Sequence, residues 1–188
     1  MFALNVPNVL TVLRIVLVPV LVVALLDKTP DGDLLAAIVF AVASLTDALD
    51  GYIARARKQV STFGKLMDPL ADKLLVVAAL IALVSLHRLE AWVAMVIIAR
   101  EFTVTVLRMA ASQAGVVMAA SSLGKLKTIV QVATIMLLIA VDNRPLWLDL
   151  LVYGMVGITV LSGADYFFGL RRRIEQAQRD RRSAAEAV

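Results

Sequence analysis

Cysteine is absent from the 188-residue chain, and histidine occurs only once, at His87. The absence of cysteine excludes disulfides, thiolate catalysis and thiolate-ligated metals, and the single histidine excludes most zinc sites, because zinc relies on these two residue types. Any bound metal is therefore expected to have oxygen ligands, which favours a hard ion such as Mg²⁺ or Mn²⁺. Charged residues (18%) and aromatic residues (6%) are also scarce.

Aliphatic residues are abundant in this chain. Hydrophobic residues make up 61% of the chain, and the mean hydropathy is +0.86. Soluble domains are about 45–50% apolar and about 25% charged, and a soluble core has no room for this excess. The composition predicts an integral membrane protein, with lipids and no nucleic acid among its partners.

The hydrophobic residues are arranged in blocks that match the length of a membrane span, which is about 20 residues. The pattern predicts an all-α integral membrane fold with six transmembrane helices. These helices would form one domain over residues 1–173, followed by a basic cytoplasmic tail over 174–188. The six blocks lie near residues 8–26, 33–57, 66–86, 89–114, 123–141 and 147–171.

Basic residues are unevenly divided between alternate loops. Lys28, Arg88 and Arg144 fall on one side of the predicted membrane, and the other 16 of the 19 Lys and Arg residues fall on the other. Positive loops stay in the cytoplasm, so the chain is expected to have both termini there. Two observations made separately, an even number of spans and this charge bias, agree on that topology.

The polar residues inside the blocks gather at the same side. Arg14 lies early in the first block, Arg100 and Arg108 late in the fourth, and Asp165 late in the sixth. This predicts a polar active site at the cytoplasmic membrane boundary, with Asp165 in a salt bridge to one of its basic residues. A transporter would place charges near the middle of the membrane instead.

Four aspartates stand close together in the sequence. Asp47 and Asp50 are three residues apart and share one helical face, and Asp68 and Asp72 are four apart on another. The stretch between the two pairs reverses the chain, so two helices can present four carboxylates to each other. Pro69 implies that the second helix begins only near Leu66 or that it kinks there.

Four carboxylates at a boundary of low dielectric constant cannot all stay ionised without cations. Two divalent metal ions would neutralise them and would form the clamp used for displacement at phosphorus. The alternative is a proton or cation relay in an ion-coupled transporter, because intramembrane carboxylates also serve that purpose.

The sequence around these aspartates resembles the signature of the CDP-alcohol phosphatidyltransferase family. Its pattern is Asp-x2-Asp-Gly-x2-Ala-Arg-x8-Gly-x3-Asp-x3-Asp, which fixes eight positions between Asp47 and Asp72. The N-terminal segment PNVLTVLRIVLVP is similar to the family's first helix, and six spans is its usual core. The resemblance implies a homodimer with a divalent-metal site and a CDP-lipid donor, from which CMP departs as the leaving group.

Roles for individual residues follow from the same resemblance. It implies that Asp47, Asp50, Asp68 and Asp72 hold two metal ions, Mg²⁺ or Mn²⁺, and that Asp72 is also the general base for the acceptor hydroxyl. The residues that it implies for binding CDP-diacylglycerol are Asn8, Thr11, Gly51, Ala54, Arg55, Ser61 and Gly64.

Residues 98–131 resemble the bacterial branch of the family that transfers a phosphatidyl group to sn-glycerol 3-phosphate, which implies a bacterial plasma membrane. Four basic residues there are expected to bind the acceptor phosphate, with Glu101 orienting a neighbouring Lys or Arg. Simple snorkelling of these side chains at the membrane interface is the alternative. Inositol phosphate, serine or phosphatidylglycerol would be the acceptor in a sister enzyme. The four residues are Arg100, Arg108, Lys125 and Lys127.

Overall fold

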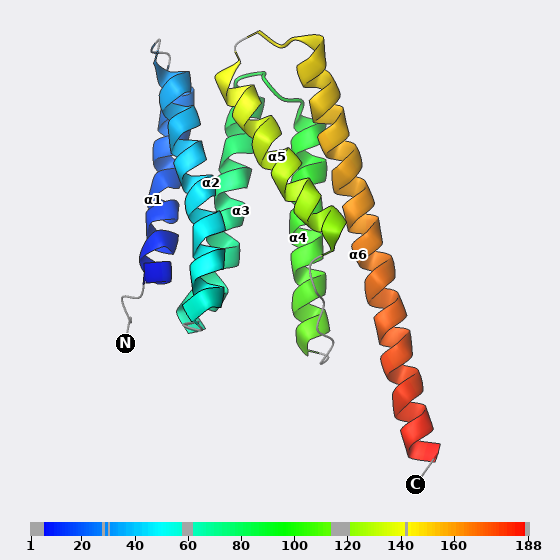
Figure 1. The fold of residues 1–188 in the computed structure, drawn as a ribbon. Helices are drawn as coiled ribbons and strands as arrows, with labels where there is room; N and C mark the ends of the chain where they lie inside the picture. The colour runs from blue at the N-terminus through cyan, green and yellow to red at the C-terminus, as the bar shows by residue number, and fades with distance from the viewer. Residues whose placement is uncertain are drawn as a thin grey trace. The chain divides into compact units, whose positions relative to one another are not determined.

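The computed structural model describes residues 6–27, 29, 31–57, 62–113, 121–141 and 143–186. Within its helices, the side chains of residues 6–8, 47–57, 62–70, 72, 173–174 and 177–186 are outside the description. Six helices and no strands make up the described chain (Figure 1), which confirms the predicted all-helical fold. They are α1 (Val6–Leu26), α2 (Gly32–Arg57), α3 (Thr62–Ser85), α4 (Ala91–Gln113), α5 (Ser122–Ala140) and α6 (Leu146–Glu186).

The start of α3 and the end of α6 differ from the boundaries predicted from the sequence. α3 already begins at Thr62 and continues through Pro69, so the predicted start near Leu66 is wrong. Proline is tolerated in the first turns of a helix because those N–H groups have few intrahelical partners, but Pro69 lies beyond them. α6 continues without a break to Glu186, so the basic residues after 173 lie on a helical extension of the last block.

The chain divides into two compact units. The first contains residues 1–94 and 132–149, and the second contains residues 95–131 and 150–188. α1, α2 and α3 belong to the first unit, and the later helices contribute to both.

α1 packs against both α2 and α3 in the first unit (Figure 1). Leu21 of α1, Phe40 of α2 and Leu80 of α3 are completely buried in this packing. The turn from α1 to α2 requires a glycine, because a Cβ atom at Gly32 would lie 2.7 Å from the carbonyl oxygen of Asp27. This tight turn sets α1 and α2 side by side in opposite directions.

The outer surface is apolar, as expected for lipid contact. Side chains such as Val23, Met95 and Ile129 are more than 60% exposed, whereas Arg14 and Lys127 are almost completely buried. Exposed apolar patches of this extent are found where a protein meets a membrane or a partner. Among the described residues, three helices are long and apolar enough to span a membrane, over Val9–Leu26, Ser122–Ala140 and Leu146–Arg172.

The other predicted spans are interrupted by polar residues. Within the described side chains, the apolar stretches of α2 and α3 extend over Gly32–Thr46 and Lys73–Ser85, and the aspartate motif lies on the adjoining turns of both helices. Arg100 and Arg108 interrupt α4 in the same way. Six complete spans therefore stay a prediction that rests on the helix number and the loop charges.

The end of α3 has a specific geometry that turns the chain toward α4. The amide of His87 donates to the carbonyl of Val84, and the amide of Arg88 donates to the carbonyl of Leu83, which is the Schellman arrangement. His87 takes the left-handed position, with φ of 57°. The His87 side chain is exposed, and the turn places Arg88 within hydrogen-bonding reach of Asp33 of α2.

Two arginines near this turn form ion pairs and hydrogen bonds that connect the ends of several helices. Arg88 forms a bidentate pair with Asp33 in the first turn of α2, at 2.6 and 2.8 Å, and donates to the carbonyl of Ile139 near the end of α5. Arg144 pairs with Glu90 at 2.9 Å and with Asp149 at 2.5 Å. Carboxylates at helix N-termini also interact favourably with the helix dipole.

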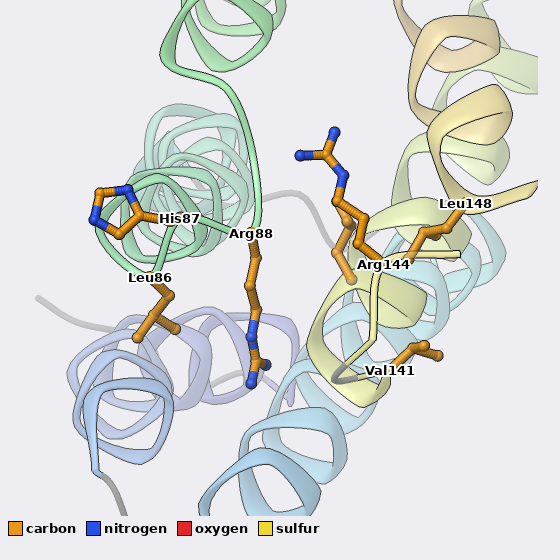
Figure 2. A pocket seen from close by; sticks show the side chains of 7 residues that line it. Leu86, His87, Arg88, Val141, Arg144 and Leu148 are labelled. Carbon is orange, nitrogen blue, oxygen red and sulfur yellow. The ribbon is translucent and has the colours of Figure 1, made fainter. Parts of the chain in front are cut away.

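A cavity of about 210 Å³ lies between these arginines (Figure 2). Their guanidinium groups point in opposite directions, each toward its own carboxylates. The hydrogen bond from Arg144 lowers the pKa of Glu90, so the pair stays ionised at neutral pH. Because Arg88 and Arg144 line one cavity, the prediction that their loops lie at the same end is confirmed.

Candidate active site

The aspartate motif occupies the facing parts of two consecutive helices in the first unit. Asp47 and Asp50 lie in the last three turns of α2, and Asp68 and Asp72 lie in the first three turns of α3. The predicted CDP-binding positions Gly51, Ala54, Arg55 and Gly64 lie on the same stretches, and Asn8 lies in the first turn of α1. The side chains of all these residues lie outside the described set, and Ser61 lies outside it entirely.

The backbone nevertheless explains how the motif is assembled. Only residues 58–61 separate α2 from α3, so the chain reverses immediately after the first pair of aspartates and before the second. Consecutive helices with so short a connection pack antiparallel. The spacings of three and four residues keep each pair on one helical face.

α1 places two further polar residues inside the first unit. Thr11, a predicted CDP-binding residue, is completely buried, and Arg14 is 1% exposed. They lie three residues apart on the face of α1 that also buries Leu21. Arg14 was expected only as one of the polar residues at the cytoplasmic boundary, and a charge inside an apolar helix is itself a signal of function. Arg14 adds a buried positive charge to the unit that contains the four aspartates.

A polar cluster in the second unit contains three of the four predicted acceptor-binding residues. Lys127 of α5 is 3% exposed and forms an ion pair with Glu101 of α4, as predicted for that glutamate. Glu101 also lies 3.7 Å from Arg100, although adjacent residues point from different faces of a helix. Lys125, by contrast, is exposed near the start of α5.

α6 completes this cluster with side chains that the sequence analysis did not assign. Arg100 donates to the hydroxyl of Ser162 at 2.9 Å, and Arg108 donates to the hydroxyl of Tyr166 at 3.3 Å. The guanidinium carbon of Arg108 also lies 5.5 Å from the centre of the Tyr166 ring. Ser162 and Tyr166 are four residues apart and so share one face of a helix. Two polar groups on one face of an apolar segment were the feature of the sequence that could have indicated their role.

The charges of this cluster are not balanced. Glu101 neutralises Lys127, whereas Arg108 has no carboxylate partner in the described part of the chain. Asp165 is exposed and makes no ion pair with the described residues, so its predicted salt bridge is not found. The cluster therefore retains excess positive charge, which favours an anionic ligand.

Buried polar atoms without protein partners occur in the same unit. The Nε atom of Arg100, the Oε1 atom of Gln131 and the hydroxyl of Thr159 have no hydrogen-bond partner among the described residues. Thr159 is completely buried and Gln131 is 3% exposed. Since buried polar groups are normally paired, such atoms mark places where a water molecule or a ligand binds.

The described side chains contain no cluster of three or more acidic or histidine residues that suits a metal ion. The motif aspartates lie outside that set. Their role as metal ligands stays a prediction.

Known proteins resemble this chain over most of its length. A sequence model of the CDP-alcohol phosphatidyltransferase family matches residues 4–161. A CDP-diacylglycerol–glycerol-3-phosphate 3-phosphatidyltransferase of Bacillus subtilis (strain 168) is 42% identical, with 87% of this chain and 93% of that protein covered. The enzyme of the same name from Rickettsia bellii (strain RML369-C) is 36% identical, with the same two coverages.

A third relative comes from Mycobacterium tuberculosis. The probable phosphatidylglycerophosphate synthase of Mycobacterium tuberculosis (strain ATCC 25618 / H37Rv) is 41% identical over 86% of this chain and 79% of that protein. The family match includes both aspartate pairs and the basic cluster of α4 and α5. With its all-helical, lipid-exposed fold, the chain belongs to the CDP-alcohol phosphatidyltransferase family of membrane transferases.

Proposed function

We propose that this protein transfers a phosphatidyl group from CDP-diacylglycerol to sn-glycerol 3-phosphate and so forms phosphatidylglycerol phosphate and CMP. The observation that carries the proposal is the combination of the complete aspartate motif with a basic cluster of excess positive charge, in which Lys127 is buried, Arg100 is half-buried and Arg108 is exposed. Relatives that share the family and are named for this reaction support it.

The donor half of the proposed site is the aspartate motif. Four carboxylates between Asp47 and Asp72 of a chain without cysteine suit Mg²⁺ or Mn²⁺, which prefer oxygen ligands. Asp47, Asp50, Asp68 and Asp72 would hold two such ions, and the bound ions would supply positive charge next to the phosphate oxygens of the donor. The proposed contacts to the CDP group come from Asn8, Thr11, Gly51, Ala54, Arg55, Ser61 and Gly64.

The proposed reaction is a displacement at phosphorus. Asp72 accepts the proton of the primary hydroxyl of glycerol 3-phosphate as that oxygen attacks the phosphorus bearing diacylglycerol. A new P–O bond forms to the acceptor, the P–O bond to CMP breaks, and CMP leaves with the electron pair. The chain contributes mainly by positioning two charged substrates and by stabilising charge on the transferred group.

The acceptor half is the basic cluster of the second unit. A phosphate monoester carries nearly two negative charges, so it matches a cluster with excess positive charge and an arginine that lacks a carboxylate partner. Arg100, Arg108 and Lys127 are the proposed phosphate contacts, together with the exposed Lys125. Snorkelling alone does not account for Lys127, because its side chain is buried in an ion pair.

The choice of acceptor is tested by CMP release from purified protein supplied with CDP-diacylglycerol, Mg²⁺ and one acceptor at a time. We expect release with glycerol 3-phosphate and at most about a hundredth of that rate with serine or glycerol, which lack the phosphate. Faster CMP release with inositol phosphate or phosphatidylglycerol would contradict glycerol 3-phosphate as the acceptor. It would still agree with phosphatidyl transfer from CDP-diacylglycerol. Metal binding without CMP release for any acceptor would favour the transporter.

We also propose a cytoplasmic site in a bacterial plasma membrane, supported by the loop charges and by bacterial relatives. Because the chain has no cysteine, single-cysteine variants give an unambiguous test. His87→Cys in intact cells should react with a membrane-impermeant maleimide, and Arg172→Cys should react only after permeabilisation. The reverse pattern would contradict the topology. Both residues are exposed, so burial does not confuse the comparison.

A homodimer is proposed from the family alone. Light scattering of the purified protein in detergent measures its mass, and a monomer at all protein concentrations would contradict this part of the proposal.

A further inference from the structure

Two arginines of α4 are held by consecutive turns of α6. Arg100 donates to Ser162, and the Ser162 hydroxyl in turn donates to the carbonyl of Thr159 at 3.0 Å. Ser162 is 1% exposed, so its hydroxyl is fixed between these two partners. Arg108 donates through its Nε atom to Tyr166, which is 5% exposed.

These contacts bring the two guanidinium groups toward each other. Arg100 and Arg108 are eight residues apart on α4, which corresponds to about 12 Å of helix, at 1.5 Å per residue. Their partners Ser162 and Tyr166 are four residues apart on α6, or about 6 Å. Because the partners are closer together than the arginines, the two side chains lean toward each other between α4 and α6. Proteins bring like charges together in this way where an anion binds between them.

The contact with Tyr166 restrains Arg108 without neutralising it. The hydroxyl accepts from Nε, and the ring lies against the guanidinium carbon, but neither contributes a negative charge. The terminal nitrogens of Arg108 make no hydrogen bond to the described residues, so their N–H groups remain available to a ligand. Ser162 likewise restrains Arg100 through a neutral hydroxyl.

Gly163 allows α6 to approach Arg100 closely. A Cβ atom at this position would lie 3.3 Å from Cγ of Arg100, which is closer than an ordinary van der Waals contact. A methyl group there would displace the arginine side chain by a few tenths of an ångström. Gly157, two turns earlier on the same helix, has no atom within 4 Å of such a Cβ.

We propose that Ser162, Gly163 and Tyr166 of α6 are positioning residues that hold the guanidinium groups of Arg100 and Arg108 as a pair for the phosphate of the acceptor. The inference rests on the proposed function, because it assigns the acceptor phosphate to this pair. It gives α6 a role in acceptor specificity through the arginines, with no direct contact to the reacting atoms.

The test compares steady-state kinetics of Gly163→Ala and Gly157→Ala. Both substitutions add one methyl group to α6 and raise its helix propensity equally, but only the first displaces Arg100. We expect Gly163→Ala to raise KM for glycerol 3-phosphate by about three- to tenfold, as for the loss of about one hydrogen bond. KM for CDP-diacylglycerol should stay unchanged, and Gly157→Ala should match the wild type in both constants.

Tyr166 provides a second, independent comparison. Tyr166→Phe removes the hydroxyl and keeps the ring, whereas Tyr166→Leu removes both, and Phe167→Leu removes a neighbouring exposed ring as the control. KM for glycerol 3-phosphate should increase in the order wild type, Tyr166→Phe, Tyr166→Leu, to about tenfold or more for the last. Arg108→Ala removes the guanidinium group itself, so its KM for glycerol 3-phosphate sets the upper limit for the Tyr166 variants.

Two results would overturn the inference. One is an unchanged KM for glycerol 3-phosphate in both Gly163→Ala and Tyr166→Leu, beside an active wild type. The other is a parallel rise of KM for both substrates, which would indicate a general structural role. If the wild type itself shows no turnover with glycerol 3-phosphate, the proposed function fails first, and the two failures are thereby distinguished.

Discussion

Asp72→Ala is expected to lower kcat for phosphatidyl transfer by at least about a thousandfold, because general-base catalysis alone contributes about 10²–10⁴ and the side chain is also a proposed metal ligand. Binding of CDP-diacylglycerol should be affected much less, since three aspartates and the CDP-binding positions remain. The measurement is CMP release at saturating concentrations of both substrates, together with donor affinity. The matched control is Asp31→Ala, which changes an exposed aspartate in the turn between α1 and α2.

The pH dependence of kcat distinguishes a general base at Asp72 from a residue that only binds metal. A residual activity of Asp72→Ala that no longer falls at low pH is the expected result, because the group that must be deprotonated has been removed. Near-normal turnover in this variant would remove the base assignment. A kcat that recovers fully at high Mg²⁺ would show that Asp72 acts only as a ligand.

Removal of divalent metal is the second change with a large expected effect. EDTA should abolish CMP release completely, and excess Mg²⁺ or Mn²⁺ should restore it, because four uncompensated carboxylates would repel the phosphates of the donor. EDTA already saturated with Mg²⁺ is the control for effects of the chelator itself. Turnover that persists in EDTA at the uninhibited rate would contradict a metal-dependent site.

The aspartates should also differ in how they respond to metal concentration. Asp47→Asn removes one proposed ligand and no base, so we expect it to need at least about tenfold more Mg²⁺ for half-maximal activity. Direct calorimetric titration of Mg²⁺ into the wild type and Asp47→Asn gives a readout independent of turnover. Equal affinities in the two proteins would exclude Asp47 as a ligand.

Helix positions were largely predictable from the sequence. Six apolar blocks were predicted and the described part of the chain contains six helices, because hydrophobic segments of about 20 residues leave few alternatives to a helix. Pro69 allowed either a start of α3 near Leu66 or a kink, and the observed start at Thr62 excludes the first of these alternatives. Charge counting in the loops correctly grouped Arg88 with Arg144, although no sequence rule predicted their carboxylate partners.

The site was predictable only in part. The pairing of Glu101 with a neighbouring basic residue followed from helical geometry, and the ion pair with Lys127 confirms it. The contacts of Arg100 with Ser162 and of Arg108 with Tyr166 join residues about 60 positions apart, and a single sequence does not show which helices are neighbours. Whether the four aspartates bind metal stays a prediction from their spacing and from the family.

The most direct test of the central claim is the stoichiometry between the two products. Purified protein is supplied with CDP-diacylglycerol, Mg²⁺ and radiolabelled glycerol 3-phosphate, and both released CMP and label incorporated into lipid are measured over time. The proposed function predicts equal amounts of the two at every time point, and neither product without the acceptor. CMP release without incorporation of label into lipid would contradict phosphatidyl transfer to glycerol 3-phosphate.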